Sequence, residues 1–167
     1  SQIGCITSHL DFFARTENLE KILFEQDIIY VGGGNTKSML AVWKEWNLDI
    51  ILKKAYEKGI IMSGVSAGAI CWFDKGITDS YADNLKILDC LGIVNGIACP
   101  HFDEESEREP FVTDLIEKEV IDSCICIEGN CAVHITNEKD IKSVNFGLDK
   151  KSYLLSKENN KLLKKFF

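Results

Sequence analysis

The sequence has few of the residues that mark several protein classes. Only two of its 167 residues are proline and three are histidine, and no stretch approaches the roughly 18 consecutive apolar residues of a membrane span. The seven cysteines are an odd number without a C-x-x-C pair, which argues against a complete disulfide framework and against a zinc ribbon. With 19 basic and 26 acidic residues, the net charge of −7 argues against a nucleic-acid-binding protein, which needs a basic face.

The sequence does contain enough apolar residues, 46% of the chain, to build one packed domain. Thiols that are not paired are typical of a reducing compartment, so we expect a cytoplasmic protein. We expect no metal or other cofactor. Cys124 and Cys126 in particular are expected to point to opposite faces of a strand and therefore not to hold a metal together.

Short apolar runs alternate with helical patterns along most of the chain. The apolar runs at 28–31, 60–62 and 125–127 each end near a glycine, as strands buried on both faces of a parallel sheet do. This alternation predicts an α/β three-layer sandwich with a mostly parallel sheet. Expected helices cover residues 17–25, 36–46, 49–58 and 107–121, and a small antiparallel C-terminal segment is expected from 131–136, 143–148 and 153–156.

A G-x-S-x-G pattern occupies residues 64–68, with Ser66 at its centre. It follows the 60–62 strand and precedes a helix expected over 67–73, which is the context of a nucleophile elbow. The turn would expose the Ser66 hydroxyl and direct the Ala67 amide toward a developing oxyanion. The alternative is an ordinary glycine-rich turn with Ser66 as a helix cap.

A second glycine-rich turn, residues 32–34, also follows an apolar run and opens a helix. A phosphate-binding loop is excluded, because Lys37 and Ser38 come too soon for a Walker motif. A dinucleotide fingerprint is excluded because position 37 is not glycine. We therefore expect the Gly34 amide to be the second oxyanion donor.

An activated serine needs a base and a group that orients the base. Of the three histidines, His101 is the expected base, because it follows the 97–98 strand, whereas His9 and His134 lie away from such a turn. The orienting carboxylate stays open at this point. Candidates are Asp79, Glu128 and the acidic run that includes Asp103, Glu104 and Glu105, which is more typical of a solvated face.

These features together resemble the serine peptidases of the peptidase E (α-aspartyl dipeptidase) and cyanophycinase family. Four blocks match in order: Gly-Gly-Gly-Asn-Thr at 32–36, Gly-x-Ser-Ala-Gly-Ala at 64–69, Pro100-His101-Phe102 and Glu128-Gly129-Asn130. The resemblance implies a three-layer fold like that of class I glutamine amidotransferases. It also implies a serine-type dipeptidase that uses no metal, acts on short peptides and favours an N-terminal aspartate.

The resemblance implies a role for individual residues as well. Ser66, His101 and Glu128 become nucleophile, base and orienting acid, and the Gly34 and Ala67 amides become the oxyanion hole. Asp79 matches an additional acidic residue important for activity. Asn35, Thr36 and Arg108 are the substrate-binding candidates, although the acidic loop before Arg108 would repel an aspartate side chain.

Three alternatives remain open. An α/β-hydrolase-type esterase could use Ser66, Asp79 and His101, although their spacing is compressed. A cysteine amidotransferase would need cysteine at the elbow, and Cys71 comes too late. A non-catalytic binding module could keep the same fold. The expected partner is a small peptide substrate, with no nucleic acid or membrane, and a homodimer is left open.

Family members carry a strand-helix stretch ahead of the triple-glycine turn. Only 31 residues precede Gly32 here, and the first of them is Ser1. We therefore expect residues 1–167 to be a single catalytic domain that lacks the family's N-terminal portion.

Overall fold

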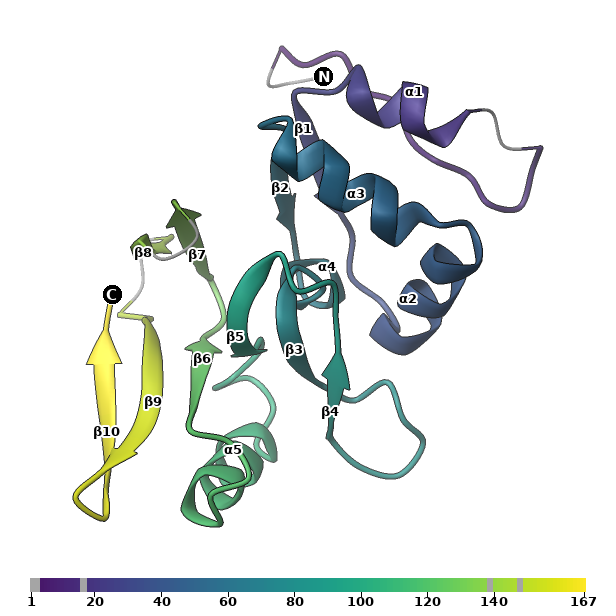
Figure 1. Cartoon of the computed structure of the whole chain (residues 1–167). Helices are drawn as coiled ribbons and strands as arrows, with labels where there is room; N and C mark the ends of the chain where they lie inside the picture. Colours follow the sequence, from purple (N-terminus) through teal and green to yellow (C-terminus); the bar gives the residue numbers. More distant parts are fainter. Residues whose placement is uncertain (1–3, 16–17, 138–139, 147–148) are drawn as a thin grey trace.

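The computed structural model describes residues 4–15, 18–137, 140–146 and 149–167 (Figure 1). It is a mixed α/β structure with a central six-stranded sheet. Its N-terminal part contains a parallel pair of strands, in which Ile28 lies opposite Ile61 and Val31 lies opposite Gly64. The elements of this part are α1 (Leu19–Phe24), β1 (Ile28–Val31), α2 (Thr36–Glu45), α3 (Leu48–Glu57) and β2 (Ile61–Gly64). All five overlap elements expected from the sequence, within the described residues.

The six-stranded sheet has the order β10-β9-β6-β5-β3-β4. Only β3, β5 and β6 run parallel, and the strands outside them pair antiparallel. Among the described residues, the antiparallel ladders of this sheet are β9–β10, β6–β9 and β3–β4. The first two involve the C-terminal segment that was expected to be antiparallel, so the expected mostly parallel arrangement differs from the structure only at β4. The strands are β3 (Phe73–Thr78), β4 (Lys86–Asp89), β5 (Val94–Cys99), β6 (Ser123–Ile127), β9 (Ser152–Glu158) and β10 (Lys161–Phe166).

The physical reason lies in the connections between strands. A parallel pairing needs a long crossover, whereas a short turn returns the chain antiparallel. β9 and β10 are joined by Asn159 and Asn160, both at positive φ (49° and 60°), which is the backbone of a tight hairpin turn. The helix expected over 67–73 is also shorter: α4 spans Ala67–Ile70, and β3 begins three residues later.

Two layers cover the central sheet. α5 (Arg108–Glu117) packs on one face through Val112 and Ile116, which lie in a buried cluster with Cys99, Cys124 and Cys126. The other face packs against α4 and against a hairpin of β7 (Cys131–Thr136) and β8 (Asp140–Asn145). The β7–β8 hairpin, β9 and β10 form the antiparallel C-terminal segment. The strand expected over 143–148 corresponds to β8, which begins earlier, at Asp140, and part of the expected range lies outside the described residues.

Cys124 and Cys126 do not point to opposite faces of β6, so that expectation is wrong. Residues two apart in a strand share a face. Both thiols are buried on the α5 side, whereas Ile125 and Ile127 belong to the cluster on the other side.

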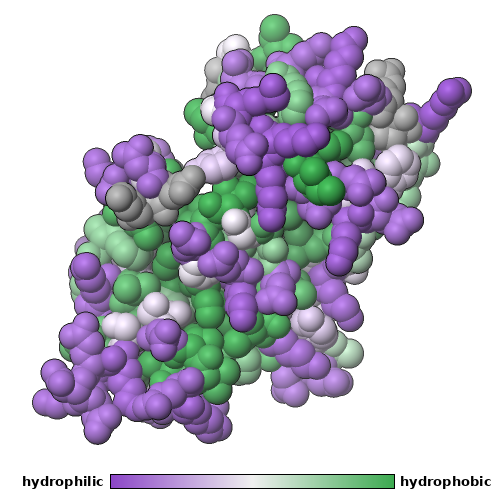
Figure 2. Space-filling view, in the orientation of Figure 1, coloured by the Kyte–Doolittle hydropathy of each residue, from purple (hydrophilic) through white to green (hydrophobic). Residues whose placement is uncertain are grey.

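The β1–β2 pair is covered by helices on one face only. Ile29 is buried against Leu52 of α3. On the opposite face, the side chains of Ile28, Tyr30 and Ile61 are 53%, 67% and 58% exposed. Figure 2 shows polar residues concentrated at the two ends of the molecule and apolar residues across its middle. Among the described residues, β1 and β2 share no ladder with the six-stranded sheet.

Candidate active site

The site begins at the turn between β2 and α4. Ser66 has φ 56° and ψ −118°, a backbone conformation that costs a non-glycine residue about 1–3 kcal/mol. The glycines on either side allow the turn. A Cβ on Gly64 would lie 2.2 Å from the Gly68 carbonyl oxygen, and a Cβ on Gly68 would lie 2.1 Å from the Val31 carbonyl oxygen. The turn therefore tolerates no side chain at these two positions.

His101 approaches Ser66 from the end of β5. Its Nε2 lies 3.0 Å from Ser66 Oγ, within hydrogen-bond distance. His101 itself has φ 52°, and the next residue, Phe102, donates its amide to the Ile127 carbonyl at the end of β6. The ends of β2, β5 and β6 thus meet at Ser66 and His101, which the sequence had singled out as nucleophile and base.

The carboxylate beside His101 is Glu104. Its Oε2 lies 2.6 Å from His101 Nδ1, and the Glu104 amide donates to the His101 carbonyl in the same turn. Glu104 also packs against Gly129, where an added Cβ would lie 2.4 Å from Oε1. Glu128, the acid expected from the family resemblance, instead accepts a hydrogen bond from the Lys151 amide at 2.9 Å. The short turn after His101 thus brings Glu104, and not Glu128, to the ring in this structure. Which of the two carboxylates orients the base stays a prediction.

The triple-glycine loop lies directly beside the nucleophile. A Cβ on Gly33 would lie 3.3 Å from Ser66 Cβ, and Gly34 has φ 143°, which favours glycine. Asn35 caps α2, because its Oδ1 accepts the Ser38 amide at 2.9 Å. The Gly34 amide and the Ala67 amide, which begins α4, are therefore on the two backbone turns that flank Ser66. Their role as an oxyanion hole remains a prediction.

Two of the expected substrate-binding residues form hydrogen bonds within the fold. Thr36 is 2% exposed, its amide donates to Ser80 Oγ at 2.8 Å, and Thr78 Oγ1 donates to its hydroxyl at 3.3 Å. Asn35 Nδ2 donates to the Ser80 carbonyl at 3.2 Å. Thr36 is thus buried away from any substrate, and Asn35 joins the triple-glycine loop to the end of β3.

Arg108 is not available to a substrate side chain. Its guanidinium is 2% exposed; Nε and Nη2 both lie 2.7 Å from Glu105 Oε2, and Nη1 donates to the Ile77 carbonyl. Asp79 Oδ1 lies 4.0 Å from Nη2. Arg108, a substrate-binding candidate from the sequence, is therefore placed inside the fold, where it pairs with Glu105.

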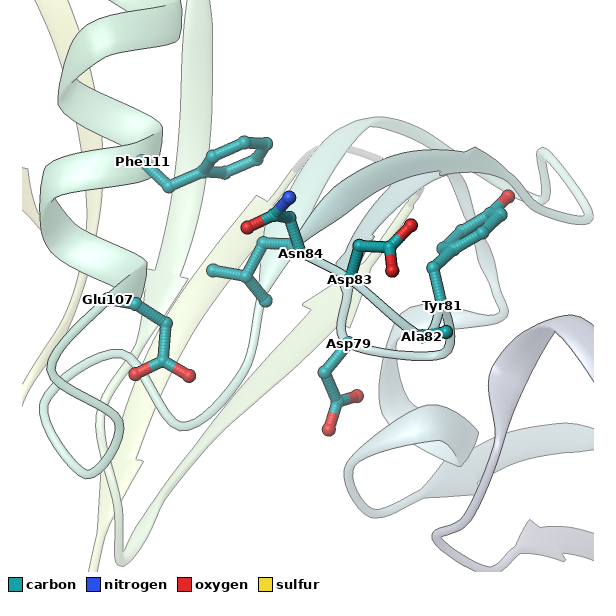
Figure 3. A pocket seen from close by; sticks show the side chains of 8 residues that line it. Asp79, Tyr81, Ala82, Asp83, Asn84, Glu107 and Phe111 are labelled. Carbon is teal, nitrogen blue, oxygen red and sulfur yellow. The ribbon is translucent and has the colours of Figure 1, made fainter.

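Asp79 lies in the loop after β3, with 68% of its side chain exposed. It lines an open pocket of about 380 Å³ whose carboxylates are Asp79, Asp83 and Glu107 (Figure 3). The remaining lining residues are Tyr81, Ala82, Asn84, Leu85 and Phe111. Figure 3 shows these side chains coming from the β3–β4 loop on one side and from α5 and the residue before it on the other.

No group of three or more His, Cys, Asp or Glu side chains in the described part of the chain is arranged to hold a metal ion. Cys71, five residues after Ser66, is fully buried, and burial raises the pKa of its thiol, so it is a poor nucleophile. The described residues also contain no helix long and apolar enough to cross a membrane.

Comparison with known proteins finds relatives that are named as peptidases. The chain is 41% identical over 152 residues to the uncharacterized peptidase YgaJ of Bacillus subtilis, covering 90% of this chain and 66% of YgaJ. It is 30% identical over 116 residues to the uncharacterized peptidase Lmo0363 of Listeria monocytogenes, covering 64% of this chain and 56% of that protein. The chain thus spans less than two thirds of the length of these curated relatives.

The fold is also similar to the crystal structure of a peptidase E candidate from Listeria monocytogenes EGD-e. That similarity has a TM-score of 0.60 at 23% identity and covers 77% of this chain and 64% of the other. The sequence model of peptidase family S51 matches residues 1–142, which include Ser66, His101 and Glu104. The chain therefore belongs to peptidase family S51, which confirms the resemblance to the peptidase E family.

Proposed function

We propose that this chain forms the active site of a serine peptidase that cleaves short peptides through an acyl-enzyme. The observation that carries the proposal is the 3.0 Å contact between Ser66 Oγ and His101 Nε2, with Glu104 at 2.6 Å on the other ring nitrogen. Such an arrangement activates serine, because one nitrogen accepts the hydroxyl proton while the carboxylate fixes the tautomer and stabilises the imidazolium.

The reaction follows from these positions. His101 accepts the Ser66 proton as Oγ attacks the scissile carbonyl carbon, and the Gly34 and Ala67 amides donate to the oxygen that becomes negative. The imidazolium then gives its proton to the leaving amine as the C–N bond breaks. Water then gives a proton to His101 as its oxygen attacks the carbonyl carbon of the Ser66 ester. When the C–Oγ bond breaks and the acid leaves, the imidazolium returns that proton to Ser66 Oγ. Glu104 holds the ring throughout.

The charges in the loops that follow the neighbouring strands β3 and β5 bear on specificity. Arg108 is neutralised by Glu105, and the pocket carboxylates Asp79, Asp83 and Glu107 would repel an aspartate side chain. We therefore propose a dipeptidase-like activity without a preference for N-terminal aspartate. A panel of dipeptides that varies the first residue tests this point, and a clear preference for aspartate would contradict it.

The proposal also includes the type of fold and the cellular location. The elbow turn between a parallel strand and a short helix supports a fold of the class I glutamine amidotransferase type. The buried thiols Cys99, Cys124 and Cys126 suit a reducing cytoplasm, which we propose as the location.

Ser66→Ala tests the chemistry directly. It should lower kcat by roughly 10⁴-fold, as removal of a triad member does elsewhere. A fluorophosphonate should label the unaltered protein and not the variant. Ser106→Ala is the matched control, because Ser106 is an exposed serine in the loop after His101 and should leave both readings unchanged.

Three outcomes would contradict the proposal. Undiminished peptide hydrolysis by Ser66→Ala would exclude Ser66 as the nucleophile. Hydrolysis of an aryl ester with no cleavage across the peptide panel would favour an esterase. Absence of labelling in correctly folded protein would favour a non-catalytic binding module.

A further inference from the structure

A chain of three hydroxyls joins the triple-glycine loop to the end of β3. Thr36 begins α2, and its amide donates to Ser80 Oγ at 2.8 Å. Thr78 ends β3, and its Oγ1 donates to the Thr36 hydroxyl at 3.3 Å and lies 2.7 Å from Ser80 Oγ. Because Thr36 and Thr78 are each 2% exposed, these hydrogen bonds are shielded from water.

Ser80 both donates and accepts within this chain of hydroxyls. Each hydroxyl carries one proton, and the Thr78 proton is given to Thr36. The proton between Thr78 and Ser80 therefore comes from Ser80 Oγ, whose lone pairs remain free to accept the Thr36 amide. The Ser80 amide also donates to Thr78 Oγ1, at 3.2 Å. A side chain without a hydroxyl cannot replace Ser80 here.

The same residue holds the position that directly follows Gly34. Asn35 Nδ2 donates to the Ser80 carbonyl at 3.2 Å, so Ser80 binds both residues after Gly34. On the other side, Gly33 is packed against the nucleophile, because an added Cβ would lie 3.3 Å from Ser66 Cβ. Gly34 lies between these two attachments, and its own backbone, at φ 143°, is the least restricted of any residue type. The direction of the Gly34 amide therefore depends on the two attachments.

The segment that carries Ser80 is itself held in place by its neighbours. The ring of Tyr81, the next residue, has the Lys37 ammonium 4.8 Å and the Lys86 ammonium 4.7 Å from its centroid. Lys37 belongs to α2 and Lys86 begins β4, so the loop after β3 is attached to both elements. Ser80 therefore offers its hydroxyl and carbonyl from a fixed position.

We propose that Ser80 is a positioning residue for the oxyanion hole. Its hydroxyl and its carbonyl hold the two residues that follow Gly34 and so fix the direction of the Gly34 amide. The inference rests on the proposed peptidase function, in which this amide donates to the oxygen that becomes negative. An oxyanion donor stabilises the transition state because it is oriented before the charge develops. Loss of the Ser80 hydroxyl should therefore slow the chemical step and leave substrate binding unchanged.

Ser80→Ala should lower kcat by about 10-fold and change KM by less than about twofold. The expected loss is smaller than the roughly 10²- to 10³-fold cost of removing an oxyanion donor, because the Gly34 amide is loosened and not removed. Ser80→Thr keeps the hydroxyl and should restore kcat. Ser38→Ala is the matched control, because Ser38 is an exposed serine in the first turn of α2 and its amide, which bonds to Asn35, is unaffected by the substitution.

The result that would overturn the inference is defined for each variant. An unchanged kcat in folded Ser80→Ala, or a rise in KM alone, would show that Ser80 does not act on the chemical step. A lower melting temperature with an unchanged kcat would show that Ser80 only supports the fold. If Ser80→Ala does not fold, Thr78→Val repeats the test, since it keeps the shape of a buried side chain and removes the hydroxyl beside Ser80 Oγ.

A second readout does not depend on peptide hydrolysis. In protein labelled with glycine that carries carbon-13 at the carbonyl and nitrogen-15, an HNCO spectrum shows only the amides of Gly33 and Gly34, because the sequence has no other glycine that follows a glycine. The order parameter of the Gly34 amide should fall from about 0.85 toward 0.6 in Ser80→Ala and stay unchanged in Ser80→Thr. An unchanged order parameter in Ser80→Ala would overturn the inference. If the order parameter falls but the unaltered protein cleaves no peptide and takes no label, the proposed function fails instead.

Discussion

Replacing Glu104 with Gln removes a negative charge beside His101 while keeping the size of the side chain. The contact of 2.6 Å is in the range of a charge-assisted hydrogen bond. Bonds of this kind contribute about 1.5–3 kcal/mol. Because the two side chains are 48% and 32% exposed, we expect the lower part of that range, about 1.5–2 kcal/mol, or about a 10- to 30-fold loss of kcat/KM.

Glu128→Gln is the matched comparison. Glu128 accepts the Lys151 amide, and an amide oxygen at the same position can still accept that hydrogen bond. The Glu128→Gln substitution should therefore lower kcat/KM by less than about threefold at pH 8, because no hydrogen bond is lost. The assay is kcat/KM on the best dipeptide of the panel, together with the rate of fluorophosphonate labelling. Thermal unfolding of each variant shows whether the fold is intact.

The reasoning fails if Glu128→Gln costs more than Glu104→Gln while both variants stay folded. The orienting acid would then be Glu128, as the family resemblance implies, and the Glu104 contact would be incidental. Equal losses near 10-fold would mean that both carboxylates stabilise the imidazolium and that neither alone orients it.

Two further predictions concern the fold that supports the site. Gly68→Ala should destabilise the protein by about 3 kcal/mol or more in urea unfolding, because the added Cβ would press against the Val31 carbonyl. Gly32→Ala is the control and should be tolerated, because a Cβ at Gly32 meets no atom within 4 Å. Equal stability of the two variants would contradict the packing described for the turn. Burial raises the pKa of Cys90 and of Cys99 from 9.0 to about 12, so these thiols keep their protons in the fold after the unfolded chain has lost them. Under reducing conditions, these two thiols should therefore not affect the free energy of unfolding below pH 9. Between pH 9 and 12, each thiol should lower the free energy of unfolding by about 1.4 kcal/mol per pH unit. The prediction is contradicted if Cys99→Ala leaves this slope unchanged.

The pairing of Ser66 with His101 could be predicted from the sequence, because the backbone conformation that each residue needs is encoded locally. Ser66 is flanked by glycines that the crowded turn requires, and His101 follows the apolar run that forms β5. The carboxylate that contacts His101 could not be predicted in the same way. Glu104 belongs to an acidic run typical of a solvated surface, and it reaches the ring only because His101 has a positive φ and begins a tight turn. Its position three residues after His101 is the signal that could have identified it.

The hairpin at the edge of the sheet and the burial of Arg108 could not be predicted for a different reason. Alternating strands and helices favour a parallel sheet, but the pairing of β9 with β10 depends on the Asn159-Asn160 turn, whose side chains tolerate positive φ and could have indicated a hairpin. Arg108 is charged and lies next to the acidic loop, so the sequence suggests that its side chain binds a ligand. Its burial is a property of how α5 packs over Ile77 and Cys99, which no local pattern encodes.

Ser66 follows β2 and His101 follows β5, and these strands belong to different sheets. The distance between Oγ and Nε2 is therefore not fixed by a strand ladder; it depends on how the two sheets are docked, through α4 and the hydrogen bonds that join Thr36 to Thr78 and Ser80. A shift of about 1 Å between the sheets would separate the two atoms while every strand stayed paired. The proposed peptidase activity is therefore expected to report this docking more sensitively than circular dichroism. As denaturant is added, the activity should disappear while the secondary structure is still intact.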